Sequence, residues 1–219
     1  MTLPPDPRTT YDAHEPVTDE RRTRKHELVR QVKRVIDLTA HLDVGELDDP
    51  AGLDDLIDAT RALADRLEGL PSLHAKGGLG AAGGDDGALL ERSGISGRSN
   101  PLAPPVQWHV GADRTVGWAT YGAAYEGPVG CLHGGFVAAA FDDLMGAAQM
   151  MSKQAGYTGT LVVRMRRPTP LHRRIDYEAG VERVEGRKIF VWGTAHCEGE
   201  LLADAEIVFI APRDGSRPR

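Results

Sequence analysis

The most restrictive feature of this 219-residue sequence is a long apolar segment with two adjacent acids in its middle. The segment runs from about Gly134 to Ser152, which would span about 27 Å as an α-helix. Its apolar side chains form a broad arc: Phe136, Val137, Ala140, Leu144, Ala147, Ala148 and Met151. A helix this apolar is buried in a globular protein. The rest of the chain must therefore supply the structure that covers it.

The two acids, Asp142 and Asp143, face different surroundings because successive helical residues lie about 100° apart. Asp142 shares a line of the helix with mostly small residues: Gly135, Ala138, Ala139, Gly146 and Gln149. Small residues let a ligand or another chain segment approach closely, and burying a bare carboxylate is costly. Asp142 is therefore expected to face a cleft or a partner group, whereas Asp143 is interpreted as structural or solvated.

Segments of β-forming residues lie on both sides of this helix. We expect strands at Val106–Val110, Thr115–Tyr121, Gly159–Arg167, Asp176–Val184, Lys188–Cys197 and Leu201–Ala211. The turns at 185–187 and 198–200 are short, so the last strands should be antiparallel neighbours. The pattern predicts an α+β fold in which one sheet covers one helix.

The N-terminal part has a different composition, with apolar residues at helical spacing in a basic segment and then in an acidic one. The acidic helix is predicted to begin at Asp49, with Pro50 in its first turn. The two helices could pair as a hairpin or pack on the rest, and we interpret them as a structural cap. The predicted organisation is a flexible leader (1–17), a helical region (18–75), a Gly-rich linker (76–100), the strand-rich domain (101–212) and a flexible tail (213–219).

Composition excludes several classes of protein. The formal net charge of −6 argues against a general nucleic-acid binder, and no apolar run approaches the roughly 20 residues of a membrane span. No secretory signal is evident, so a cytoplasmic location is expected. Cys131 and Cys197 form no disulfide framework, and the histidines show no metal-ligand spacing. Cys131 lies two residues before His133, but a small apolar filler is favoured over a Cys-His nucleophile.

The chain enters the apolar helix through Gly130-Cys131-Leu132-His133-Gly134-Gly135. The first-turn N–H groups of a helix have no partner within the helix, and the helix dipole adds partial positive charge. Glycine lets an oxyanion approach such amides closely. Asp142 offers a carboxylate farther along the helix, and Thr158 offers a hydroxyl at the start of the next strand.

This combination resembles the PaaI-like group of hotdog-fold acyl-CoA thioesterases. The resemblance is carried by His133-Gly134-Gly135, by Asp142 nine residues after the histidine, by Thr158, and by the run 161–171 that contains Arg167-Pro168. Tyr125-Glu126-Gly127-Pro128 also fits that group's approach to the helix. The resemblance covers about residues 100–212.

The resemblance implies a hotdog fold: a long central helix wrapped by a curved antiparallel sheet of about six strands, here with an N-terminal helical extension. It also implies a homodimer or a dimer of dimers (a homotetramer), with chains paired edge to edge and active sites at the interface. The implied reaction is acyl-CoA hydrolysis in lipid metabolism, without a metal or a separate cofactor, because coenzyme A is part of the substrate.

Carried over by position, Gly134 would donate its amide to the thioester oxygen, and His133 would orient or polarise the thioester. Asp142 would be the general base or the nucleophile. Thr158, supplied by the partner chain, would help to hold the water or the carboxylate. Thr160 competes for this last role, because two residues along a strand return to the same face.

Substrate binding is expected to involve Gly135 and three arginines, Arg164, Arg166 and Arg167, which could contact the coenzyme A phosphates. Strand alternation places Arg164 and Arg166 on one face and Arg167 on the other. Two alternatives remain open: a non-catalytic acyl-CoA binding or scaffolding protein, and a hotdog enoyl-CoA hydratase.

Overall fold

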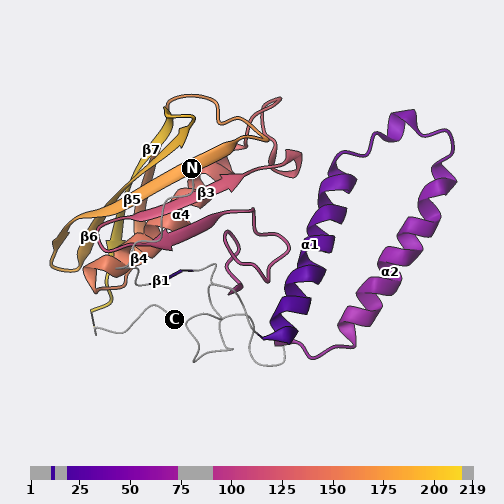
Figure 1. Cartoon of the computed structure of the whole chain (residues 1–219), viewed down its shortest axis with the longest axis horizontal. Coiled ribbons are helices and arrows are strands. Elements are labelled where there is room, and N and C mark those ends of the chain that lie inside the picture. Colours follow the sequence, from indigo (N-terminus) through magenta and orange to yellow (C-terminus); the bar gives the residue numbers. More distant parts are fainter. Residues whose placement is uncertain (1–10, 13–18, 74–90, 214–219) are drawn as a thin grey trace.

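The computed structural model describes residues 11–12, 19–73 and 91–213. In chain order its α-helices and strands are β1 (Tyr11–Asp12), α1 (Glu20–Ala40), α2 (Asp54–Glu68), β2 (Gln107–Val110), β3 (Thr115–Thr120), α4 (Gly134–Ala148), β4 (Tyr157–Met165), β5 (Arg174–Glu185), β6 (Lys188–Cys197) and β7 (Glu200–Ile210). Four 3₁₀ turns are η1 (Val44–Glu46), η2 (Pro50–Leu53), η4 (Ala123–Tyr125) and η5 (Gln149–Ser152). Figure 1 shows their arrangement.

All strands of the described residues join one antiparallel sheet in the order β1-β2-β3-β5-β6-β7-β4. The six predicted strands are confirmed with small shifts at their ends. Gly186 and Gly199 have positive φ in the tight turns that join β5 to β6 and β6 to β7. The seventh strand is the two-residue β1, which lies within the expected leader and pairs with β2.

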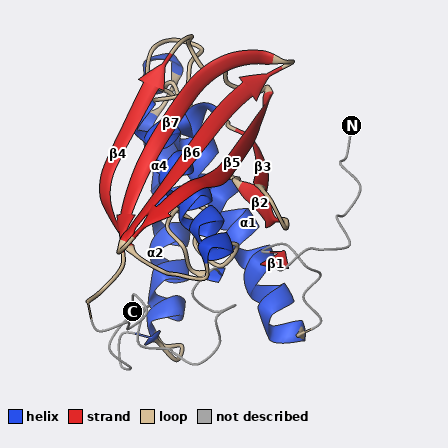
Figure 2. Ribbon diagram, turned by 90° about the vertical axis from the view of Figure 1, so that its left-hand side faces the viewer, coloured by secondary structure: helices blue, strands red, loops and turns tan. Residues whose placement is uncertain are grey.

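Helix α4 lies against one face of the curved sheet, and the core fills the space between them (Figure 2). Phe141, Leu144 and Met145 are at most 1% exposed. The helix can come close to the sheet because the strands carry glycine opposite it. At Gly193, for example, an added Cβ would lie only 3.1 Å from the Phe141 ring, so a larger residue would push the helix away. The predicted helix ends as expected near Ser152, with its last turn tightened into η5. This arrangement is the hotdog fold that the sequence implied.

The N-terminal helices form an arm beside this domain (Figure 1). Helix α1 packs on the domain through Val29 and His26, which are 6% and 8% exposed. Helix α2 lies farther out and has no buried residue. Both helices begin close to their predicted starts, and Asp49 caps the turn η2 that leads into α2. No helix among the described residues is long and apolar enough to cross a membrane.

Residues 91–100, which were expected as the end of a linker, form turns packed on the domain. Ser96 is 6% exposed, and the side chain of Ser93 bonds to α4. The rest of the expected linker and the tail from 214 onward lie outside the described residues, as do residues 1–10 and 13–18 of the expected leader.

A buried polar contact joins α1 to these turns. The carboxylate of Glu91 lies 2.6 Å from His26 Nε2 and accepts a hydrogen bond from the Ser99 hydroxyl at 2.6 Å. Burial alone would raise the pKa of Glu91, but the bonds from Ser99 and His26 and the charges of His26 and Arg98 outweigh it and hold the pKa below its ordinary value of 4.5. Such a carboxylate stabilises the fold above its unfolded pKa, and its contribution is lost as the pH falls through the lowered folded value.

We therefore expect Glu91→Gln to loosen α1. Replacing a charge-assisted acceptor with a neutral one should cost about 1–2 kcal/mol, or roughly tenfold faster amide exchange in α1. Hydrogen exchange measured by mass spectrometry at pH 7 checks this. Glu27→Gln is the matched control, since Glu27 pairs with Arg30 and Gln31, both exposed residues of the same helix. Equal protection of α1 in both variants would contradict the anchoring role of Glu91.

Candidate active site

The start of α4 is organised by His133. Its ring Nδ1 accepts the Gly135 N–H at 3.0 Å, so the side chain caps the helix. A neutral ring that accepts at Nδ1 carries its proton on Nε2, and His133 is exposed. Its backbone carbonyl accepts from Phe136 and Val137. The amide of Gly135 is therefore used within the chain, and a role of this residue in substrate binding stays a prediction.

The Gly134 amide is the first-turn donor for which no described residue provides an acceptor. Gly134 is half-buried beneath the side chain of Met165, whose terminal methyl would lie 2.9 Å from a Cβ at this position. Backbone bonds hold the approach to the helix: Leu132 donates to Thr169 and His133 to Tyr125. The amide is thus fixed in place at the surface of the domain.

Asp143 is a structural residue, as expected. It accepts the indole N–H of Trp108 at 2.9 Å and the hydroxyl of Ser93 at 2.9 Å. Trp108 is 1% exposed, so its N–H needs this acceptor. Sequence reasoning missed these two partners, because strand β2 and the turn at Ser93 are remote from α4 in the chain. Their bonds fix the rotation of the helix about its axis.

Asp142 consequently points away from the core and is exposed. Its Oδ1 accepts the hydroxyl of Thr158 at 2.8 Å. The resemblance implied that a partner chain brings Thr158 to this carboxylate, and this expectation is wrong for the bond observed. Both residues belong to one chain, because β4 follows α4 after a short connection and runs back along the helix.

A β-bulge separates the two threonines of β4. Thr158 pairs with Phe209 and Thr160 with Val208, so Gly159 is an extra residue in β4. Phe209 is buried beneath the sheet, which places Thr158 on the helix side. Thr160 falls on the opposite face, next to half-buried Val208. The expectation that both hydroxyls share a face is therefore wrong, since the bulge resets the alternation.

The Gly134 amide and the Asp142 carboxylate do not meet within one chain. Eight residues of α-helix separate them, or about 12 Å along the axis. A single chain thus presents two half-sites: a free amide with His133 at the start of α4, and a carboxylate held by Thr158 two turns later.

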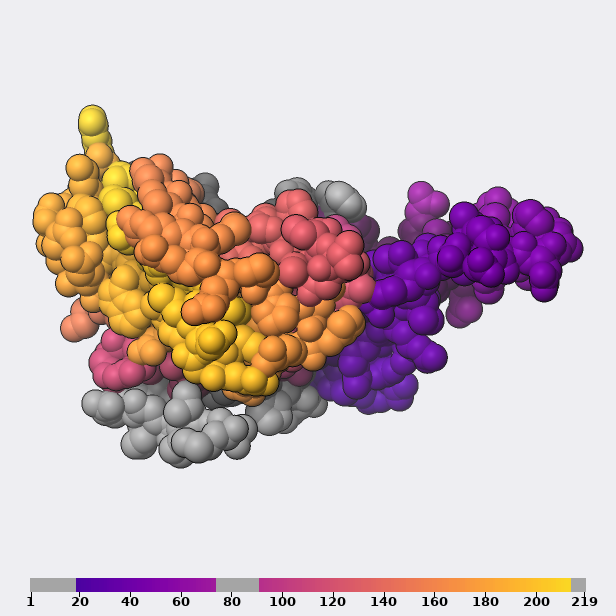
Figure 3. Space-filling model, turned by 90° about the horizontal axis from the view of Figure 1, so that it is seen from above, coloured from indigo at the N-terminus to yellow at the C-terminus, as the bar shows by residue number. Residues whose placement is uncertain are grey.

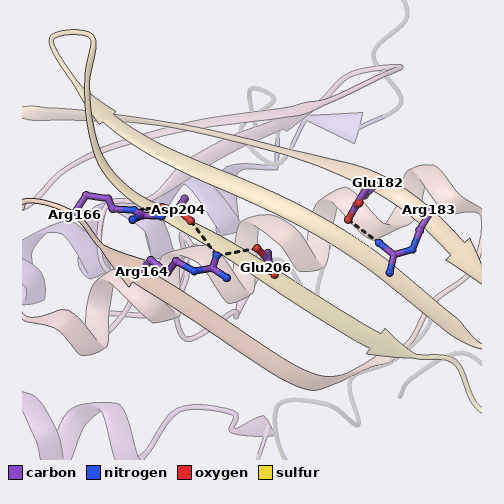
Figure 4. A network of polar contacts seen from close by, with 6 residues as sticks. All are labelled: Arg164, Arg166, Glu182, Arg183, Asp204 and Glu206. Carbon is purple, nitrogen blue, oxygen red and sulfur yellow. Dashed lines mark hydrogen bonds and ion pairs between the residues drawn. The ribbon is translucent and has the colours of Figure 1, made fainter.

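The three arginines at the end of β4 and just beyond it fall into two groups. Arg164 bonds to Asp204 at 3.1 Å and Glu206 at 2.8 Å, and Arg166 lies 2.5 Å from Asp204 on the same outer face (Figure 4). Two of the three arginines expected at the coenzyme A phosphates are therefore engaged by carboxylates. Their common face agrees with the predicted alternation.

Arg167 instead lines a pocket of about 470 Å³. The other lining residues are Pro168, Pro170, Arg173, Cys197, Glu198, Glu200 and Leu202. Arg173 is paired with Glu198, whereas Arg167 has no carboxylate partner among the described residues. Pro170 also forms a bridge to Cys131 in the loop before His133, so the pocket adjoins the start of α4. Within the described ranges, no three side chains of the metal-binding types lie close enough to hold an ion.

Comparison with known proteins supports this architecture. No family model matches the sequence. One curated relative is acyl-coenzyme A thioesterase THEM4 of Xenopus laevis, 33% identical over 91 residues, which are 41% of this chain and 41% of that protein. The chain thus matches about two fifths of the length of this relative.

Among solved structures, a thioesterase superfamily protein, RHA08564, superposes with a TM-score of 0.75 at 24% identity, over 94% of this chain and 97% of that one. The two chains therefore share a fold. The superposed region extends beyond the hotdog domain into the N-terminal part. Zebra fish thioesterase superfamily member 2 covers 49% of this chain and 81% of its own, at 18% identity and a TM-score of 0.46.

The two acids of α4 should differ in their effect on stability. We expect Asp143→Ala to lower the free energy of unfolding by about 1–3 kcal/mol, because the buried Trp108 N–H and the Ser93 hydroxyl lose their acceptor. Asp142→Ala should change it by less than about 0.5 kcal/mol, since exposed Asp142 has one exposed partner. Urea unfolding followed by circular dichroism measures both, and equal losses would contradict this division of roles.

Proposed function

We propose that this protein hydrolyses acyl-CoA thioesters at sites that combine two copies of the chain. The observation that carries the proposal is the exposed Asp142 carboxylate, held by Thr158 on a helix whose first amide has no acceptor among the described residues. The superfamily fold and the local similarity to an acyl-CoA thioesterase support the same reaction class.

The chemistry needs two groups of opposite character. Attack on the thioester carbon places negative charge on the carbonyl oxygen, which the Gly134 amide and His133 Nε2–H would stabilise. Asp142 would take a proton from the attacking water, or attack directly to form an anhydride that water then cleaves. The C–S bond breaks, the acid is released, and the thiolate of coenzyme A is protonated.

A second copy would bring the two half-sites together. No described strand pairs with the outer edge of β4. Two large side chains of β4 are largely exposed, Tyr157 at 56% and Met165 at 55% of their surface. An uncovered edge strand readily pairs with another chain. Two-fold antiparallel pairing of β4 would set the two α4 helices antiparallel, so that the start of one approaches the middle of the other. Gly134 of one copy would then face Asp142 of its partner.

The amide can be tested by Gly134→Pro. Proline lacks the N–H yet suits the first helical position, and the preceding His133 has φ −62° and ψ 132°, which proline tolerates. Gly134→Ala adds a similar contact with Met165 but keeps the donor, and is the matched control. We expect Gly134→Pro to lower kcat by about 10²–10³-fold, and Asp142→Asn by about 10²–10⁴-fold.

The assay is a panel of acyl-CoA substrates with a thiol-trapping reagent, and circular dichroism confirms that each variant is folded. Full activity in folded Asp142→Asn, or equal activity in the proline and alanine variants, would remove that group from the mechanism. Saturable binding without release of coenzyme A would instead indicate a binding protein. Hydration of an enoyl-CoA would indicate the hydratase.

We further propose that Arg167, rather than Arg164 or Arg166, contacts the coenzyme A phosphates, because it alone of the three lines the pocket and lacks a carboxylate partner among the described residues. Arg167→Ala should raise KM for acyl-CoA about tenfold, the loss of one charge-assisted contact. KM for an acyl-pantetheine thioester without nucleotide phosphates should not change. Arg164→Ala is the control, and an equal rise in its KM would contradict the assignment.

A further inference from the structure

The N-terminal arm carries two apolar stripes, one on each helix, that no described residue covers. The α1 stripe consists of Leu28, Val32, Val35, Thr39 and Leu42, and the α2 stripe of Leu53, Leu56, Thr60, Leu63, Leu67 and Leu70. Their positions alternate in steps of three and four residues, the heptad spacing of helices that pack on other helices. Figure 3 shows the arm projecting from the domain.

Most of each stripe is open to solvent in the single chain, and only Val32 and Leu53 are half-buried. On α2, Leu56 is 62% exposed, Leu70 just after the helix is 58% exposed, and on α1, Val35 is 51% exposed. Helix α1 uses another face, with His26 and Val29, to dock on the domain. The α1 stripe is therefore additional to the surface that anchors the helix. Large exposed apolar patches on a folded protein mark surfaces for association.

The charges of the two helices are opposite, and this selects the partner. Helix α1 contains seven Arg or Lys and three Asp or Glu. The segment 43–68, which includes α2, contains nine acidic and two basic residues. A second copy offers complementary charge to both helices at once. A lipid surface does not, since anionic lipids would repel the acidic helix.

We propose that the arms of two copies pack against each other as a four-helix bundle, which buries both stripes. In a two-fold arrangement each basic α1 lies between two acidic α2 helices, one from its own chain and one from its partner, so that every neighbouring pair has opposite net charge. This interface uses surfaces separate from the β4 edge and from the Asp142 and Gly134 half-sites.

Cross-linking of mixed isotopes tests the contact directly. Unlabelled and ¹⁵N-labelled full-length chains are mixed and treated with a carbodiimide, which joins amines to carboxylates in contact. We expect peptides that join exposed Lys25 of α1 in one isotope to an acid of segment 43–68 in the other. If the only such links join segments of the same isotope, or none form, the proposal is wrong.

Substitution of the α2 stripe provides the second test. Leu63→Asp/Leu67→Asp should halve the mass of the largest species in sedimentation equilibrium, or raise its dissociation constant at least tenfold, because the bundle would bury two carboxylates from each chain. Ala62→Asp adds one such carboxylate on the opposite, exposed face of α2 and should change neither value. Both residues of the double variant are exposed in the single chain, so the domain should stay folded.

The outcome is independent of the catalytic proposal. The bundle would be overturned if the double variant assembled like the wild type. It would also be overturned if the wild type bound phosphatidylcholine/phosphatidylglycerol vesicles and the double variant did not. Neither result would affect the thioesterase assay. Inactive Asp142→Asn with intact mixed-isotope links would support both proposals separately.

Discussion

The pair of bonds that Asp143 accepts from Trp108 and Ser93 sets the geometry of the whole site. Helix α4 is apolar around most of its circumference, so hydrophobic burial alone leaves its rotation poorly defined. A buried indole N–H that must be satisfied removes this freedom. Once Asp143 is turned inward, the neighbouring Asp142 must face outward, where Thr158 holds it. A polar contact in the core thus places the candidate catalytic carboxylate.

The same helix separates the groups that thioester hydrolysis needs together. The Gly134 amide, which has no acceptor in the described part of the chain, lies at the first residue of α4 and the carboxylate two turns later, too far apart for one thioester to touch both. The separation follows from the rise of the helix and no side-chain rearrangement shortens it. A reaction that uses both groups would therefore need a second, symmetry-related copy of the chain. The edge of β4, which no described strand covers, is where that copy could pair.

The proposed bundle would give the arm, too, a role in joining two copies of the chain. Its inner surface is held to the domain by a buried His26–Glu91 contact, while its heptad stripes remain open. One face thus fixes the position of α1 and another is left for association. If the β4 edge and the arm join different pairs of chains, the two contacts together produce a dimer of dimers. If they join the same pair, the arm strengthens the dimer that assembles the site.

The sequence alone determined the elements: the apolar period of α4, the alternation of six strands, and the turn glycines are local properties of the chain. It also indicated the half-sites, because the histidine, the glycines and Asp142 lie within ten residues of one another. Only the tertiary structure decided their relations. The extra residue Gly159 put Thr158 and Thr160 on opposite faces, and carboxylates from β7 engaged Arg164 and Arg166, leaving Arg167 at the pocket. Such relations depend on register and on partners remote in the chain, which residue spacing does not encode.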